Sequence, residues 1–251
     1  MDSKVSILRD IQRHKEGGFI QSNKNEDSVA IVKKGRLHRF INKTDKSDIT
    51  EMQIDNMNYI IEPYIPRNHR SIIFLSGDSG SGKTLMTSIF INQYIKHNPK
   101  NKVFYICATK KEEDDNLYKI KALKQMETNN IDEIPVEDMS NNLVVIDDTD
   151  FHPDHKKIMK FMNKMVECGR KFNISIIYSS HIHSKLSESP IYKEVSMYCT
   201  FPNALINNRM ITNNLKIDDD IIKELLIGNN AYICFNKIYR TIITDKIIMR
   251  Y

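Results

Sequence analysis

A glycine-rich loop at residues 77–84 has the composition and spacing that bind the phosphates of a nucleotide. Its eight residues fit the pattern GxxxxGK followed by Ser or Thr, and they separate a strand-like run from a segment with helical periodicity. Glycines let backbone N–H groups turn toward an anion, and the start of the following helix adds a partial positive charge. We therefore predict a triphosphate-binding loop made of Gly77, Asp78, Ser79, Gly80, Ser81, Gly82, Lys83 and Thr84, with Leu85 beside it.

Two acidic residues at the end of an apolar run supply the second half of such a site. The run at 143–146 predicts a buried strand, and Asp147 and Asp148 follow it directly. In nucleotide hydrolysis, one carboxylate holds Mg²⁺ with a hydroxyl of the loop, and a second carboxylate polarises the attacking water. We expect Thr84 and Asp147 to be the magnesium ligands. Asp148 would activate the water, and Lys83 would contact the β- and γ-phosphates of ATP.

These residues need strands that end at a common edge, and the order of the elements predicts such a sheet. Strand-like and helical segments alternate through the middle of the chain, which favours an α/β fold with a mainly parallel sheet flanked by helices. Residues 231–251 alternate apolar and polar positions, which indicates antiparallel strands at the sheet edge. We expect strands within 71–76, 102–108, 141–148 and 173–180, helices at 83–97 and 154–169, and a further helix in the charged segment that ends near residue 130.

Both predicted helices carry an apolar stripe that should face the sheet. The stripe of the first consists of Leu85, Met86, Ile89, Phe90 and Tyr94. The stripe of the second consists of Ile158, Phe161, Met162, Met165 and Val166. A separate lysine stripe on the second helix, formed by Lys156, Lys160 and Lys164, would either face solvent or contact the phosphates of a nucleic acid.

Residues 1–66 differ from the rest and indicate a small N-terminal layer or extension. Apolar runs on either side of Lys34 and Gly35 predict two strands joined by a turn, and a polar stretch follows them. Pro63 and Pro66 then precede the strand that leads into the phosphate loop. We therefore divide the chain into this extension and a nucleotide-binding domain at 67–251.

The composition is that of a globular protein inside a cell. The net charge is +5, from 37 basic and 32 acidic side chains, which is compatible with nucleic acid without requiring it. No stretch approaches the roughly 18 uncharged apolar residues that span a bilayer, and the first residues lack the apolar centre of a signal peptide. We expect no membrane insertion. The four cysteines form no CxxC pair, which argues against a disulfide framework or a zinc site.

Two other classes of nucleotide-binding protein share parts of this pattern. Residues 42–45 read NKTD, the guanine-reading motif of GTPases, but they precede the phosphate loop and would require a circularly permuted chain. A small-molecule kinase would carry an arginine-rich lid and no acidic pair of this kind. The strand at 102–108 lies in sequence between the loop strand and the acidic strand, which favours the branch of ATPases with an additional strand.

Residues 166–181, VECGRKFNISIIYSSH, narrow the choice among ATPases. They resemble a segment of FtsK/HerA-type motor ATPases in which a Gly-Arg step precedes a buried strand that ends in a polar Thr-Gln pair. With the phosphate loop, the LVVIDD strand and the short chain, the sequence resembles the genome-packaging ATPases of large DNA viruses and their virophage or transposon relatives. The resemblance covers about residues 70–200, and the Gly-Arg-strand pattern carries the narrower assignment.

The resemblance implies roles for two further residues. Arg170 matches the Gly-Arg step and would be an arginine finger that reaches the γ-phosphate held by a neighbouring subunit; alternatively, it is a surface cation that caps a helix C-terminus. His181 stands where the family usually has Gln, and it would be the γ-phosphate sensor. Asp148 stands where many relatives carry Glu, which keeps the charge and shortens the reach.

The function that the resemblance implies is Mg²⁺-dependent ATP hydrolysis that moves double-stranded DNA into a viral capsid. The partners would be DNA, further copies of the chain in a homo-oligomeric ring, and a capsid or portal-region protein. The place of action would be the cytoplasm of an infected cell, in the virus factory, or the virion itself. The alternative is a nucleotide-dependent DNA-binding switch or loader with slow hydrolysis.

Overall fold

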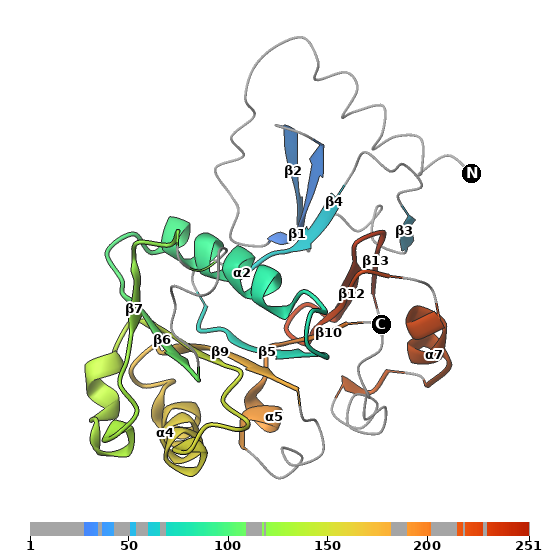
Figure 1. Ribbon diagram of the computed structural model, residues 1–251. Coiled ribbons are helices and arrows are strands. Elements are labelled where there is room, and N and C mark those ends of the chain that lie inside the picture. The colour runs from blue at the N-terminus through green and yellow to red at the C-terminus, as the bar shows by residue number, and fades with distance from the viewer. Residues whose placement is uncertain are drawn as a thin grey trace.

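The computed structural model describes residues 28–34, 37–42, 51–53, 60–65, 69–108, 117, 119–181, 190–201, 215–217, 219–227 and 230–250. A ten-stranded sheet forms the centre of the molecule (Figure 1). Six neighbouring strands are parallel: β10 (Met197–Thr200), β5 (Ile72–Ser76), β9 (Ser175–Ser180), β8 (Leu143–Asp147), β6 (Val103–Cys107) and β7 (Leu123–Gln125). Beyond β10, the sheet continues with the antiparallel strands β11 (Ile233–Asn236), β12 (Thr241–Thr244), β13 (Ile247–Arg250) and β3 (Glu51–Gln53).

The predicted fold class is confirmed, including the antiparallel strands formed by the last residues of the chain. Strand β9 lies between the loop strand β5 and the acidic strand β8, so an additional strand separates the two halves of the predicted site. Strand β6, predicted at 102–108, lies on the far side of β8.

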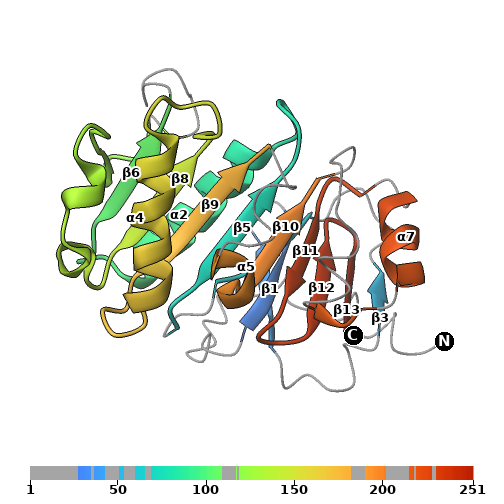
Figure 2. The same cartoon turned by 90° about the horizontal axis from the view of Figure 1, so that it is seen from below.

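Helices cover both faces of the parallel strands, which explains why these strands are almost entirely apolar. Helix α2 (Lys83–His97) packs on one face, and α4 (His155–Cys168) with the short α5 (Pro190–Glu194) packs on the other (Figures 1 and 2). Alternate residues of each strand therefore enter two separate cores; Ile73 and Leu75 face α2, whereas Ile72 and Phe74 face α4.

The apolar stripe predicted for α4 is confirmed, because all five of its residues are buried against the sheet. The stripe predicted for α2 is partly wrong. Met86, Phe90 and Tyr94 are buried, but Leu85 is 54% exposed and Ile91 takes a place in the core. The buried stripe is centred on the Met86–Phe90–Tyr94 row, which leaves Leu85 at the margin, in the first turn beside the loop.

The expected helix before residue 130 is wrong for residues 119–130, although Leu117 is helical. Residues 123–125 form β7, which pairs with β6 at the edge of the parallel strands, and short 3₁₀ turns follow at η4 (Ile131–Glu133) and η5 (Val136–Met139). An edge strand has one neighbour and exposes most of its side chains, so charged residues are tolerated there. Leu123 is buried, whereas the next two residues are exposed. The charged residues at 109–116 lie outside the described part.

The N-terminal region forms a second sheet of three antiparallel strands in the order β2 (Leu37–Asn42), β1 (Ser28–Lys34), β4 (Ile60–Pro63). This confirms the two strands predicted around the turn at 34–35. Its last strand touches the main domain, since Ile61 and Ile65 belong to the core on the α2 side and the Ile65 N–H donates to Gln93 Oε1 at 2.9 Å. Strand β3 of the same region joins the large sheet. The division of the chain at residue 66 stays a prediction.

Residues 43–45 of the GTPase-like NKTD run lie outside the described part. In the ranges that the structure covers, no helix is both long and apolar enough to cross a membrane. Helix α7 (Asp219–Ile227) lies beside the antiparallel strands (Figure 2).

Candidate active site

The glycine-rich loop follows β5 at the carboxyl edge of the parallel strands and ends at the first residue of α2. Gly80 and Gly82 have φ angles of 74° and 104°, a region that side-chain-bearing residues rarely adopt. At Gly77, an added Cβ would lie 2.6 Å from Ser81 Oγ and 3.1 Å from Phe201. The loop therefore needs glycine at each of these places, which is the condition for backbone N–H groups to surround an anion.

Phe201 supports this loop and was not predicted from the sequence. It follows β10, the strand beside β5; its N–H donates to the Ser76 carbonyl at 3.2 Å, and its ring lies under Gly77 and Gly82. Phe201 is buried. No sequence pattern marks it, because its place depends on β10 pairing with β5 from more than a hundred residues away in the chain.

Lys83 is buried at the base of the loop, 4% exposed. Its ammonium group donates hydrogen bonds to the carbonyls of Gly77 at 2.9 Å and Asp78 at 3.1 Å, and it lies 3.9 Å from Asp148 Oδ1. Burial lowers the pKa of Lys83, and the Asp148 carboxylate opposes this effect. The loop lysine and the acidic pair, predicted to share one edge of the sheet, do meet there.

Asp147 ends β8 and is buried. The Tyr105 hydroxyl donates to its Oδ2 at 3.2 Å, whereas Oδ1 has no hydrogen-bond partner in the described part of the chain. Burial raises the pKa of Asp147 to about 6, with a contribution from the Asp148 charge; Ser179, Tyr105 and Lys83 act in the opposite direction. A buried carboxylate oxygen without a donor suits a hard cation such as Mg²⁺. Thr84, the other predicted ligand, is the second residue of α2.

Asp148 begins the loop after β8 with a φ angle of 48°, which is unusual for a residue with a side chain. Its side chain is 40% exposed, and its N–H donates to the Ser179 carbonyl on β9 at 3.3 Å. The structure thus separates the two acids: Asp147 is buried, whereas the Asp148 side chain is partly exposed.

His181 follows β9, and its imidazole lies between Lys83 and Asp148. Its Nε2 is 2.9 Å from Asp148 Oδ1, and its Nδ1 is 3.1 Å from both the Gly77 carbonyl and Lys83 Nζ. The structure therefore brings together Lys83, Asp148 and His181, which sequence analysis placed in one site. Their catalytic roles stay predictions.

Asp150 was missed by sequence analysis, although it is the last acid of the run DDTD. Its carboxylate accepts hydrogen bonds from the Ser180 hydroxyl at 2.9 and 3.0 Å, from the His181 N–H at 2.9 Å and from the Tyr178 hydroxyl at 3.4 Å. The only signal in the sequence was a third carboxylate two residues after the acidic pair.

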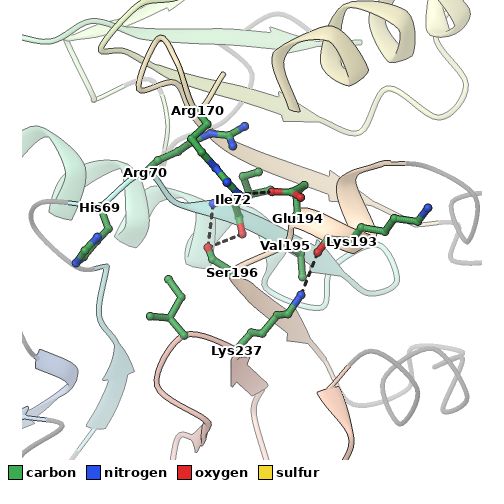
Figure 3. Close-up of a pocket in the computed structure, with 10 residues that line it drawn as sticks. His69, Arg70, Ile72, Arg170, Lys193, Glu194, Val195, Ser196 and Lys237 are labelled. Carbon is green, nitrogen blue, oxygen red and sulfur yellow. Dashed lines mark hydrogen bonds and ion pairs between the residues drawn. The ribbon is translucent and has the colours of Figure 1, made fainter. Parts of the chain in front are cut away.

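Arg170 lies at the opposite edge of the sheet, where α4 ends and the chain turns back to the start of β9. Its side chain is 82% exposed, and its Nη2 lies 3.3 Å from Glu194 Oε2 (Figure 3). Together with Arg70, Lys193 and Lys237 it lines a hollow of about 530 Å³. Arg170 cannot reach the phosphate loop of its own chain, because the full length of the parallel strands separates them.

Arg70, and not Arg170, contacts the carbonyls at the C-terminal end of α4. The Arg70 guanidinium donates to the carbonyls of Met165 and Val166 in the last turn of α4, both at 3.0 Å. These contacts add side-chain donors at a helix end, where main-chain donors run out; the Met165 carbonyl also accepts from the Gly169 N–H at 2.8 Å. Burial lowers the pKa of Arg70, and Glu194 opposes this effect.

The lysine stripe of α4 is partly occupied by contacts within the chain. Lys160 Nζ lies 3.4 Å from Asp132 Oδ2, and Lys164 Nζ donates to the Asp132 carbonyl at 3.0 Å. Lys156 is exposed, and no partner for its ammonium group is found among the described residues. The stripe therefore joins α4 to η4 over much of its length, which favours the structural interpretation over a free phosphate-binding surface.

The comparison with solved structures agrees with this arrangement. B204, the DNA-packaging ATPase from Sulfolobus turreted icosahedral virus, superposes with a TM-score of 0.52 over 71% of this chain and 98% of its own, at 13% sequence identity. The chain shares its fold with a viral packaging ATPase. The genome-packaging NTPase B204 of Sulfolobus turreted icosahedral virus 2, in complex with sulfate, gives a TM-score of 0.51 over 73% of this chain and 100% of its own, at 14% identity.

Among curated proteins, the uncharacterized protein V3 of Sputnik virophage is 26% identical over 207 residues, which are 74% of this chain and 78% of that protein. No protein-family model matches the sequence. The comparisons therefore establish the fold, and the chemistry must be argued from the residues of this chain.

Proposed function

We propose that this chain is a Mg²⁺-dependent ATPase that translocates double-stranded DNA into a viral capsid. The observation that carries the proposal is the contact between the base of the glycine loop and the acidic strand, with Lys83 Nζ 3.9 Å from Asp148 Oδ1. A phosphate cradle and a water-activating carboxylate at one sheet edge are what phosphate-anhydride cleavage requires. The packaging roles named for the structural relatives agree with it.

The triphosphate would lie in the loop 77–84, held by backbone N–H groups and by the positive end of α2. Lys83 would exchange its contacts with the Gly77 and Asp78 carbonyls for oxygens of the β- and γ-phosphates. Asp147 and Thr84 would hold Mg²⁺, which neutralises phosphate charge when bound. The Asp147 oxygen that has no hydrogen-bond donor among the described residues supports this assignment.

Asp148 would orient the attacking water and accept its proton as the bond to the γ-phosphorus forms. Its side chain is partly exposed, as a group that contacts substrate must be. His181 would hold the Asp148 carboxylate through Nε2 and sense the γ-phosphate from its place beside Lys83. The sequence departs here from the glutamine of the family, but the imidazole can make an equivalent hydrogen bond.

Arg170 would act on the nucleotide of a neighbouring subunit. Its position at the amino edge of the parallel strands agrees with a head-to-tail ring, in which this edge of one copy faces the carboxyl edge of the next. A cation supplied in this way would stabilise the charge that develops during phosphoryl transfer. The further partners would be duplex DNA and a capsid or portal-region protein, met in the infected cytoplasm or on the virion. Residues 1–66 would be an appendage to the ATPase domain at 67–251.

Steady-state ATP hydrolysis with and without long duplex DNA, measured over a range of salt concentrations, tests this proposal. A motor should turn over severalfold faster on duplex, and the stimulation should fall as salt rises, because phosphate contacts weaken with ionic strength. Asp148→Asn controls for hydrolysis by a contaminating enzyme, because it removes the water-activating carboxylate of this chain. We expect nucleotide binding to persist and hydrolysis to fall by about 10²-fold or more. Hydrolysis that duplex DNA leaves unchanged would favour the nucleotide-dependent switch or loader.

A further inference from the structure

Asp150 ties the loop after β8 to the carboxyl end of β9. Its Oδ2 accepts hydrogen bonds from the His181 N–H and the Ser180 hydroxyl, both at 2.9 Å, and Oδ1 accepts from Ser180 at 3.0 Å and from the Tyr178 hydroxyl at 3.4 Å. A single carboxylate thus receives donors from three residues at the end of one strand, Tyr178, Ser180 and His181. Main-chain and side-chain donors converge on it.

This contact decides where His181 stands. The His181 N–H is fixed by Asp150, and the imidazole of the same residue reaches Asp148 on one side and Lys83 on the other, at 2.9 and 3.1 Å. The acidic loop and β9 are also joined by the Asp148 N–H and the Ser179 carbonyl, at 3.3 Å. The contact between Asp148 and Ser179 joins the main chains of the loop and of β9. The contact between Asp150 and the His181 N–H acts directly on the residue that carries the imidazole.

We propose that Asp150 is a positioning residue that holds His181 between Lys83 and Asp148. The inference rests on the proposed ATPase function. Its physical basis is that the approach of water to a phosphate depends steeply on geometry, so a displacement of about 1 Å in a group that orients the base can cost 10²-fold in rate. Asp150 would affect hydrolysis more than nucleotide binding, since among the described residues no hydrogen bond or ion pair joins it to the glycine loop or to Lys83, on which only its charge acts.

The test compares kcat with nucleotide affinity in Asp150→Ala. We expect kcat to fall about tenfold or more, while the Kd for a fluorescent ATP analogue changes by less than about threefold. Asp150→Asn should recover most of the loss, because the amide oxygen still accepts from the His181 N–H and the Ser180 hydroxyl can reverse its direction. Asp154→Ala is the control: this acid lies in the same loop but contacts Thr128 and Lys157, so kcat should stay within twofold.

A double-mutant cycle with His181→Ala separates positioning from a general structural role. If Asp150 acts through His181, then Asp150→Ala should reduce kcat no further in the His181→Ala background. Additive losses, or an unchanged kcat in Asp150→Ala, would overturn the inference. Should Asp150→Ala fail to fold, Ser180→Ala removes the hydroxyl contacts to Asp150 and leaves the His181 N–H contact. It should show a smaller loss of kcat with the same dependence on His181. Wild-type protein without ATP hydrolysis would instead overturn the proposed function, and this inference with it.

Discussion

At the carboxyl edge of the parallel strands, polar side chains contact one another, whereas at the amino edge they stand mostly in solvent. Lys83 is 4% exposed and lies against the loop carbonyls, His181 and the acidic pair. Arg170 is 82% exposed, and in the described part of the chain its one ion pair is to Glu194, which is itself 42% exposed. Ion pairs of that kind contribute little, at most about 1 kcal/mol.

The difference shows which functional groups a single chain can place by itself. The carboxyl edge is pre-organised, because several strands end there and hold each other's side chains. The amino edge carries a hollow with basic side chains that do not converge on one point: in Figure 3, Arg70 and Arg170 lie near Glu194, and Lys193 points away from them. An arginine that acts on phosphate from this edge needs a second copy of the chain to bring the phosphate to it.

The largest expected effect is therefore that of Arg170→Ala. We expect ATP hydrolysis to fall about 10³-fold or more with ATP binding unchanged, since a missing arginine finger affects the transition state and not the bound substrate. Lys193→Ala, in the same hollow, is the control and should keep hydrolysis within about threefold. Loss of both binding and hydrolysis in Arg170→Ala would point to a role in folding.

Mixtures of two inactive variants, Lys83→Ala and Arg170→Ala, test whether the carboxyl edge of one copy and the amino edge of another form a shared site. Lys83→Ala lacks a working loop, and Arg170→Ala lacks the cation, but a mixed ring contains interfaces where an intact loop meets an intact Arg170. Mixtures should regain measurable hydrolysis. If mixtures stay as inactive as their components, the two edges do not form a shared site and the comparison drawn above fails.

Asp147→Asn should stabilise the protein in the absence of nucleotide and magnesium. The pKa of Asp147 is about 6 in the folded chain against an ordinary value of 3.8, so between these values the folded state binds more protons than the unfolded state. Stability from this group is therefore highest below about pH 4, falls as the pH rises to about 6, and stays reduced above it. The asparagine removes a cost of about 2–3 kcal/mol at pH 7.5.

Denaturant unfolding of both proteins at pH 7.5 and pH 5 measures this effect. The advantage of Asp147→Asn should shrink at the lower pH, and hydrolysis should be lost at both. A variant that is less stable than the wild type at pH 7.5 would mean that neighbouring groups compensate the buried charge.

The smallest expected effects belong to the lysine stripe. Lys160→Gln with Lys164→Gln should lower the free energy of unfolding by up to about 1 kcal/mol and leave hydrolysis within twofold, because these lysines join α4 to η4 through Asp132. Lys156→Gln removes a lysine that does not contact Asp132, and it should change neither the free energy of unfolding nor the rate of hydrolysis. Should the double variant weaken duplex binding more than Lys156→Gln does, the stripe would be a DNA surface after all.

The local patterns predicted well wherever one segment decided its own structure. The glycine spacing, the helix at 83–97 and the inward face of α4 depend on neighbouring residues, and the structure agrees. The helix predicted before residue 130 is wrong at 123–125, which form β7, because an edge strand and a helix both tolerate charge. The prediction that Leu85 belongs to the buried stripe of α2 is wrong, because helical periodicity gives the direction of an apolar stripe but not its width.

The sequence by itself determined the chemistry available to this protein: a glycine loop, a lysine and a carboxylate pair on separate segments. Only the tertiary structure decided which of them meet. Strand order placed β9 between β5 and β8, which brought His181 to Asp148 and Asp150 to the His181 N–H. The pairing of β10 with β5 placed Phe201 beneath the loop, and Arg170 was left at the far edge. Contacts between strands distant in the chain depend on sheet register and packing, which no local pattern of residues encodes.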